Sequence, residues 1–188
     1  MNDNIKPIET KYKGYLFRSR TEARWAVFFD TIGFRWQYEE EGYKLANGRW
    51  YLPDFKLILP SEDIFYIEVK PEEFDSLGDS QIIDYRFFSK EIGFPLVILT
   101  GQPNYQAYNM VRPEFEIPEE GEIFSSFSLC FFQDYHPYIK IVDEYFRGLI
   151  RMDQSTGHKY FDVDDREARK NFGERYLEAI QMAKASRF

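Results

Sequence analysis

The clearest pattern in the chain is a pair of short stretches, residues 51–59 and 64–71, in which apolar side chains dominate and partly alternate with polar ones. Residues 60–63 separate the two stretches and have the composition of a turn. Short apolar runs bounded by turn residues predict two adjacent antiparallel strands. We therefore expect a hairpin over residues 51–71, with successive side chains on opposite faces of the sheet.

Three ionisable residues fall within this predicted hairpin. Glu68 and Lys70 are two residues apart and are expected on one face, while Ile67 and Val69 lie on the other. Asp54 is on the neighbouring strand. Charged groups are costly to bury unless they are paired or bind a metal. Because two carboxylates beside an amine suit a hard divalent cation, the hairpin is a candidate metal site.

A helix is predicted from Ser19 to Ile32, because apolar residues recur there at helical spacing and Gly33 follows. Glu22 within it has two interpretations. It completes a capping box with Ser19, three residues earlier, or it continues the apolar stripe and directs its carboxylate at the sheet. The pattern alone leaves both open.

The elements around the hairpin alternate between strand and helix. Residues 34–38 predict a strand, and Asn47-Gly48 predicts a tight turn that leads into the strand of Asp54. Residues 80–92 predict a helix, and the apolar run 94–101 predicts a strand that is covered on both faces.

Two basic residues of the predicted helix 80–92, Arg86 and Lys90, lie four positions apart on one face. Such a pair is either simply solvated or placed to bind a phosphate. The end of the chain, residues 164–188, predicts a single helix with Asp164 or Asp165 as its N-cap.

Residues 102–160 give weaker signals. The segments 123–132 and 138–142 have the composition of strands, which would form a hairpin that widens the sheet, a lid or a dimer surface. Tyr135, His136 and Tyr138 suit either base stacking or core packing.

Composition narrows the classes of protein. With 188 residues, of which 44% are hydrophobic, the chain fits one globular domain with additions. A single cysteine, Cys130, rules out an intrachain disulfide and indicates a reducing compartment. No stretch has the apolar length of a membrane helix, and the polar N-terminus lacks a signal-peptide core. We therefore expect a cytoplasmic protein without membrane contact.

The net charge of the chain does not favour nucleic-acid binding, but the charge of its first 25 residues does. The formal net charge is −8, whereas phosphate binding is usually supported by a basic surface. The first 25 residues carry six basic and three acidic side chains, and the acidic residues cluster elsewhere. With two histidines, one cysteine and no phosphate-binding loop, the chain also lacks the residues of common hydrolase triads, structural zinc sites and P-loop enzymes.

The motif Pro53-Asp54 followed by Glu68-Val69-Lys70 resembles the signature of the PD-(D/E)xK nucleases, the restriction-endonuclease-like superfamily. Residues 19–29 and 182–188 resemble phage and mobile-element members of that superfamily. The resemblance implies an α/β fold with a restriction-endonuclease-like αβββαβ core and a mixed central sheet. Residues 1–101 would form this core, and residues 102–188 an extension packed on the same domain, with a β-rich insertion and a C-terminal helix.

The resemblance also implies a site. Mg²⁺, for which Mn²⁺ would substitute, is expected to be bound by Asp54, Glu68 and the main-chain carbonyl of Val69, with Glu22 as a further ligand or support. Lys70 would orient the attacking water or stabilise the charge that develops on the phosphate.

DNA is the expected partner. Arg18, Arg20 and Arg24 lie near the positive end of the first predicted helix and are expected to contact it, with Arg86 and Lys90 as further phosphate contacts. The expected assembly is a homodimer or a larger DNA-processing complex.

The leading hypothesis is a metal-dependent DNA endonuclease that hydrolyses phosphodiester bonds in phage or mobile-element DNA processing. The alternative is a catalytically silent subunit of the same fold that binds nucleic acid or protein within a larger complex. In a third interpretation, Asp54, Glu68 and Lys70 form an ordinary ion network on the sheet, which contributes little to stability.

Overall fold

The computed structural model describes residues 8–71, 77–114, 127–134, 138–152 and 159–188. Its first ten elements, in chain order, are β1 (Thr10–Tyr12), β2 (Tyr15–Phe17), α1 (Arg20–Ile32), β3 (Arg35–Tyr38), β4 (Tyr43–Lys44), β5 (Trp50–Tyr51), β6 (Phe55–Ile58), β7 (Ile64–Lys70), α2 (Asp79–Ile92) and β8 (Leu96–Thr100). The remaining elements are β9 (Tyr108–Val111), β10 (Ser128–Gln133), β11 (Tyr138–Ile141), α3 (Glu144–Leu149), β12 (Ile150–Met152), β13 (Lys159–Phe161), α4 (Asp165–Phe172) and α5 (Glu174–Ala185).

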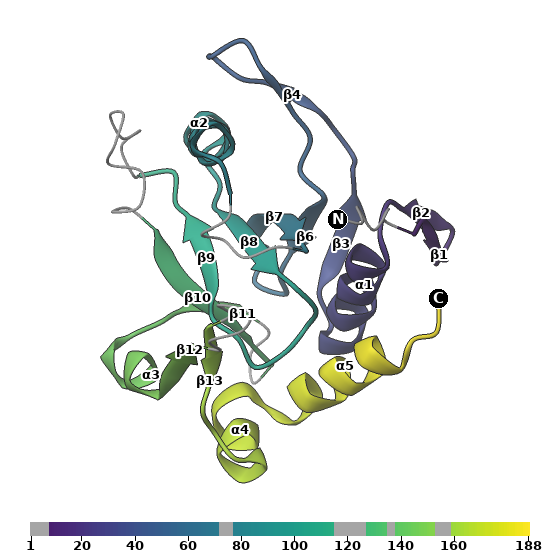
Figure 1. Cartoon of the computed structure of the whole chain (residues 1–188), viewed down its shortest axis with the longest axis vertical. Helices are drawn as coiled ribbons and strands as arrows, with labels where there is room; N and C mark the ends of the chain where they lie inside the picture. Colours follow the sequence, from purple (N-terminus) through teal and green to yellow (C-terminus); the bar gives the residue numbers. More distant parts are fainter. Residues whose placement is uncertain (1–7, 72–76, 115–126, 135–137, 153–158) are drawn as a thin grey trace, which may run out of the picture.

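A mixed seven-stranded sheet forms the centre of this α/β fold, in the order β11-β10-β9-β8-β7-β6-β3 (Figure 1). Strands β7 and β8 pair in parallel, and the other neighbours pair antiparallel. The predicted hairpin is confirmed, because β6 pairs with β7 and Phe55 lies opposite Ile67. Asp54 lies directly before β6 rather than within it.

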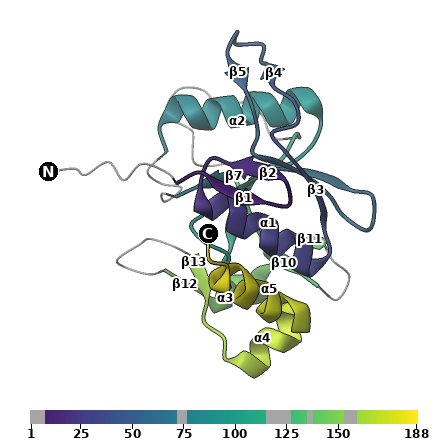
Figure 2. The same cartoon turned by 90° about the vertical axis from the view of Figure 1, so that its right-hand side faces the viewer.

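Helices cover both faces of the sheet. Helices α1 and α5 lie together on one face, where Phe28 and Tyr176 meet edge to face with ring centroids 5.3 Å apart (Figure 2). The other face carries α2, which buries Ile82 and Phe88 against the sheet in a second core cluster. Strand β8 is buried along its whole length because it lies between these layers, as its apolar run predicted.

Helix α1 begins and ends as its sequence predicted. Ser19 is the N-cap, and its hydroxyl accepts a hydrogen bond from the Glu22 N–H. Gly33 ends the helix with φ of 92°, a left-handed conformation that favours glycine. The helix thereby presents Trp25 and Phe29 to the core and holds Glu22 at the edge of the sheet.

Strands β9, β10 and β11 extend the sheet beyond β8. Of the three roles considered for residues 102–160, the described part shows the hairpin that widens the sheet, formed by β10 and β11. Strand β9, which pairs with β8, was not predicted. Residues 123–126 of the predicted strand lie outside the described residues.

The single helix predicted for residues 164–188 is wrong, because Gly173 separates α4 from α5. Its φ of 104° with ψ of 165° lies in a region that essentially only glycine occupies. A Cβ there would also overlap the carboxylate of Asp134, which accepts the Arg175 N–H at the start of α5. Asp164 is the N-cap of α4, as predicted.

The helices of the described part have no apolar segment long enough to cross a membrane.

Candidate functional site

An open cleft lies where the ends of β6 and β7 meet α2, the β4–β5 hairpin and the start of α1. The residues that line it include five of those predicted for a metal site or its support and several that were not predicted. They are Arg18, Glu22, Arg49, Trp50, Tyr51, Leu52, Asp54, Glu68, Val69, Lys70, Pro71, Ser80, Gln81, Asp84 and Tyr85. The cleft therefore collects side chains from four separate elements around one group of carboxylates.

The carboxylate of Asp54 is held in place by the neighbouring strand. It is 2% exposed, and its Oδ2 accepts the Val69 N–H at 2.7 Å. Extending the register of Phe55 and Ile67 by two residues places Pro53 opposite Val69. The strand pairing ends at Phe55 and Ile67, and the acceptor of the Val69 N–H is the side chain of Asp54 in place of a main-chain carbonyl.

The Val69 carbonyl points to the same side of β7 as its N–H, because both groups of a strand residue face the same neighbour. Pro53 has no N–H to donate to it. The carbonyl therefore lies at the cleft beside the Asp54 carboxylate, with no main-chain donor from Pro53.

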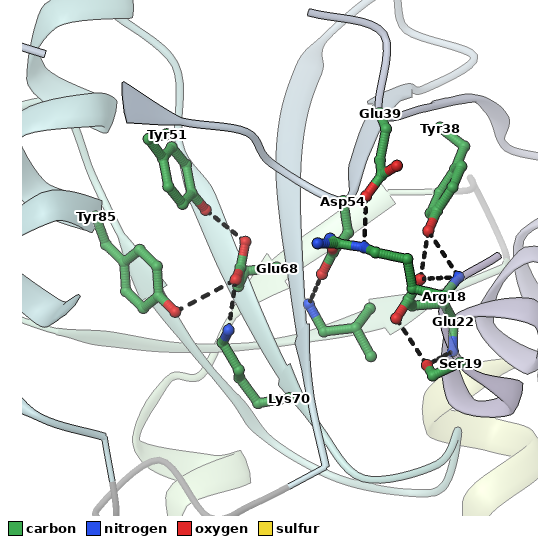
Figure 3. A network of polar contacts seen from close by, with 11 residues as sticks. Arg18, Ser19, Glu22, Tyr38, Glu39, Tyr51, Asp54, Glu68, Lys70 and Tyr85 are labelled. Carbon is green, nitrogen blue, oxygen red and sulfur yellow. Dashed lines mark hydrogen bonds and ion pairs between the residues drawn. The ribbon is translucent and has the colours of Figure 1, made fainter. Parts of the chain in front are cut away.

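Glu68 is surrounded by donors. Its Oε2 accepts the Tyr51 hydroxyl at 2.6 Å, and its Oε1 lies 2.7 Å from Lys70 Nζ and 3.4 Å from the Tyr85 hydroxyl (Figure 3). Burial and the Glu68 charge raise the pKa of both tyrosines well above the ordinary value, which keeps both hydroxyls protonated and able to donate. The contact with Lys70 confirms that residues 68 and 70 share one face.

The cleft brings like charges together. The pKa of Asp54 is raised to about 8, first by burial and then by the nearby carboxylates of Glu68 and Glu22. The Val69 N–H and the Arg18 guanidinium oppose this shift only in part. Carboxylates that are buried close together repel one another, which disfavours their charged forms. A bound cation would reduce this repulsion.

Arg18 supplies a positive charge to this cleft. Its Nη2 lies 2.6 Å from Asp54 Oδ1, and its Nε lies 2.6 Å from Glu39 Oε1. Its side chain is still 58% exposed. In Figure 3 the guanidinium lies between the two carboxylates. Arg18 is therefore both a partner of Asp54 and a surface cation at the mouth of the cleft.

Both interpretations of Glu22 hold in part. The Ser19 cap contact is present, and Glu22 Oε1 also accepts the Ser19 hydroxyl at 2.7 Å. Its Oε2 accepts the Tyr38 hydroxyl at 2.5 Å and the Arg18 N–H at 3.2 Å. Yet Glu22 is 7% exposed and lines the cleft. Because both oxygens already accept hydrogen bonds, it acts on Asp54 through its charge.

The other predicted DNA contacts do not line the cleft. Arg20 is exposed on the first turn of α1, and Arg24 is half-buried one turn later. Arg86 is buried, with its guanidinium carbon 4.7 Å from the ring centroid of Phe127, so it packs inside the fold instead of lining the cleft. Lys90 is exposed in the last turn of α2 and also does not line the cleft.

Of the aromatic residues considered for base stacking, Tyr135 and His136 lie outside the described residues. Tyr138 begins β11, at the edge of the sheet farthest from β3.

Sequence reasoning missed Tyr51, Tyr85, Arg49 and Trp50 as residues of the cleft. A usable signal existed for Tyr51, because it lies on the hairpin arm that Asn47-Gly48 predicts, just before Asp54. Tyr85 lies on the face of α2 that packs on the sheet. A hydrophobic pattern counts it as an apolar residue and gives no sign that its hydroxyl contacts the site.

Within the described residues, no three His, Cys, Asp or Glu side chains converge closely enough to enclose a metal ion by themselves. The oxygen donors available in the cleft are the Asp54 and Glu68 carboxylates, and Val69 lines the cleft with them. Magnesium sites commonly use one or two carboxylates and complete the shell with water and substrate phosphate.

No family model matches this chain, and neither a characterised protein nor a solved structure is significantly similar to it.

Proposed function

We propose that this chain is a metal-dependent DNA endonuclease of the PD-(D/E)xK type, acting in phage or mobile-element DNA processing. The observation that carries the proposal is the cleft in which the buried carboxylates of Asp54 and Glu68 lie together with Lys70. Burial, and then the nearby charge of Glu68, raise the pKa of Asp54. Perturbed ionisable groups in a cleft are typical of functional sites.

The order of elements supports this proposal. Helix α1 is followed by three strands of the central sheet, β3, β6 and β7, then by α2 and the parallel strand β8. This is the αβββαβ order implied by the resemblance. The β4–β5 hairpin interrupts it between the first and second of these strands.

The donor set fits Mg²⁺. Asp54 and Glu68 would supply carboxylate oxygens, and Val69 would supply the carbonyl that Pro53 cannot pair. When bound, the ion would lower the pKa of a water molecule and polarise the scissile phosphate. The remaining ligands would be water and substrate, which explains why few acidic side chains are required.

Lys70 is the group suited to the reacting phosphate. Its ammonium nitrogen lies 2.7 Å from Glu68 Oε1, and the Lys70 side chain, which lines the cleft, is 22% exposed. A cation at this position can stabilise negative charge on a phosphate oxygen, or orient a water molecule beside it. Tyr51 donates to the other oxygen of Glu68, Oε2, and Tyr85 donates to Oε1.

Arg18 and Arg20 would contact the DNA backbone. They precede and begin α1, where the helix dipole also favours phosphate. The net charge of −8 predicts that these contacts are few and that binding is confined to the neighbourhood of the cleft.

The ion pairs of the cleft favour a second candidate function, a catalytically silent binding module. Arg18 and Lys70 already provide a positive charge for Asp54 and Glu68, so the chain can hold these acids without a metal. Calorimetric titration with Mn²⁺ separates the two candidates. A nuclease site binds Mn²⁺ and loses this binding in Asp54→Asn, whereas a silent module shows no binding that depends on Asp54.

Cleavage tests the proposal directly. The full chain is incubated with supercoiled, linear, branched and single-stranded DNA in Mg²⁺, in Mn²⁺ and in EDTA. We expect cleavage that requires the metal and falls by about 100-fold or more in Lys70→Ala, since loss of a transition-state contact typically costs this much. Mn²⁺ affinity should change far less, because Lys70 is not a ligand.

Lys140→Ala is the matched control, since it removes the same charge from β11, at the other edge of the sheet from the strand pair of the site. It should cut like the wild type. No cleavage of any substrate, or equal cleavage by the wild type and Lys70→Ala, would contradict the proposal.

A further inference from the structure

Trp50 is the most exposed large apolar side chain among the described residues, at 73%. It lies on β5 and lines the same cleft as Asp54 and Glu68. It belongs to neither core cluster of the described residues, although the adjacent Tyr51 packs on one of them. The fold therefore gives no packing reason for an indole at this position.

The arm that carries Trp50 is fixed to α2. Leu45 is buried in the second core cluster, and Asn47 Nδ2 donates to Asp84 Oδ1 at 2.8 Å. The Ala46 N–H donates to Glu91 Oε1 at 2.8 Å. Figure 2 shows the β4–β5 hairpin standing beside α2. Trp50 is thus presented on a supported arm and not at the end of a free loop.

The other end of the arm is anchored in the site itself. Tyr51 donates to Glu68 at 2.6 Å, and Arg49 Nε lies 3.2 Å from Asp84 Oδ2. The residues on both sides of Trp50 are therefore held while its own side chain is left open. An aromatic surface that is exposed and preorganised in this way is suited to bind a flat partner with little further loss of conformational freedom.

The charges of the cleft restrict what that partner can be. The cationic side chains that line it are Arg18, Arg49 and Lys70, which are 58%, 53% and 22% exposed. Four acidic side chains, Glu22, Asp54, Glu68 and Asp84, line it as well. Two or three phosphates can be contacted here, but a long duplex backbone would meet too little positive charge to bind tightly.

We propose that Trp50 is a stacking subsite for one unpaired nucleobase next to the phosphate in the cleft, which rests on the nuclease function proposed above. The substrate is then a strand with unpaired bases, such as a single-stranded segment or a branch point, and not continuous duplex. Stacking on an aromatic side chain requires a free base face, which a paired and stacked base in a duplex does not offer.

Binding without cleavage tests this subsite. The full chain is titrated in EDTA with a single-stranded oligonucleotide, a splayed fork and the matching blunt duplex, and fluorescence anisotropy is recorded. We expect Trp50→Ala to bind the single strand and the fork about tenfold more weakly and the duplex unchanged. Trp50→Phe should retain most of the affinity, because it keeps an aromatic face.

Tyr145→Ala is the control, because Tyr145 is also an exposed aromatic residue but lies on α3 and does not line the cleft. It should bind all three ligands like the wild type. Tryptophan emission gives a second readout. Trp25 is buried and Trp36 only partly exposed, so quenching by the single strand should disappear in Trp50→Phe.

The outcomes distinguish a failure of the proposed stacking subsite from a failure of the proposed nuclease function. Binding that depends on Trp50 without any metal-dependent cleavage supports the subsite and overturns the nuclease. Cleavage with no effect of Trp50→Ala on single-strand binding overturns the subsite alone. An equal loss on duplex and single strand also overturns it, because Trp50 would then not distinguish unpaired bases.

Discussion

Arg18 Nη2 lies 2.6 Å from Asp54 Oδ1, so the chain itself places a cation against the most deeply buried carboxylate of the cleft. A divalent ion that binds Asp54 must compete with this guanidinium. We therefore expect Arg18→Gln to bind Mn²⁺ several-fold more tightly than the wild type, measured by calorimetry, because both the competitor and its charge are removed.

Arg35→Gln is a matched control for this prediction. Arg35 is exposed to nearly the same extent, 60% against 58%, and pairs with Glu62 beside the turn between β6 and β7. The variant makes the same change in net charge at a distance from the cleft. If both variants gain the same affinity for Mn²⁺, the gain reflects net charge and Arg18 does not compete at the site.

The raised pKa of Asp54 predicts a pH dependence of stability in the metal-free protein. With a pKa of about 8, Asp54 keeps its proton in the folded state up to about pH 8, whereas the unfolded chain releases it near the ordinary pKa of 3.8. Between these values the folded state binds more protons, so its stability falls as the pH rises. We expect the titration of Asp54 to lower the free energy of unfolding by at least about 1 kcal/mol between pH 5 and pH 8. This is the equivalent of a shift of one pKa unit.

Asp54→Asn removes the titrating group from this measurement. Urea unfolding in EDTA across the same pH range should therefore show a flatter profile for the variant than for the wild type. Parallel profiles for the two proteins would mean that Asp54 is ionised throughout, held so by the Arg18 guanidinium and the Val69 N–H.

Two tyrosines donate to Glu68 at different distances, so their removal is expected to have effects of different size. Tyr51 lies at 2.6 Å and Tyr85 at 3.4 Å from the carboxylate. Removing a hydroxyl that orients a ligand typically weakens metal binding by about 10-fold or more. We expect this loss for Tyr51→Phe and a smaller one for Tyr85→Phe, measured as Mn²⁺ affinity. Equal losses of Mn²⁺ affinity, or a larger loss in Tyr85→Phe, would show that the hydrogen bond from Tyr51 does not orient Glu68 for metal binding.

The boundary between α4 and α5 predicts a stability effect that is separate from the site. Gly173→Ala forces a Cβ into the Asp134 carboxylate at a φ of 104°. We expect it to destabilise the protein by about 2–4 kcal/mol in urea unfolding. Gly148→Ala has open space around its Cβ and should change stability by less than about 1 kcal/mol. A Gly173→Ala protein as stable as the wild type would contradict this account of the break.

The fold of the first hundred residues follows from local signals. Ser19 and Gly33 mark the ends of α1, and the alternating stretches around residues 60–63 mark β6 and β7. These signals are local because caps and turns depend on a few neighbouring residues. The break at Gly173 had a local signal, the glycine itself, but the Asp134 carboxylate that accepts the Arg175 N–H at the start of α5 lies far away in the sequence.

The acidic residues of the site were predicted from the sequence, but most of the residues that contact them were not. Asp54, Glu68 and Lys70 follow from a short motif, and the alternation of β7 places Glu68 and Lys70 on one face. Tyr85 depends on how α2 docks against the sheet, and the Arg18 contact depends on the path of the chain before α1. Tertiary placement of this kind cannot be read from periodicity. The buried position of Arg86 was missed for the same reason.

The parallel pair β7 and β8 lies in the interior of the sheet, with β9 hydrogen-bonded along the outer side of β8. A shortened protein that ended after Gly101 would leave a five-residue strand, four of whose residues are apolar, with an unpaired hydrogen-bonding edge. Such edges recruit strands from other molecules, and this fragment would also lose the cover that α5 provides for α1. Attempts to trim or transplant the acidic cleft should therefore carry the later strands with it, or the product will aggregate before its chemistry can be assayed.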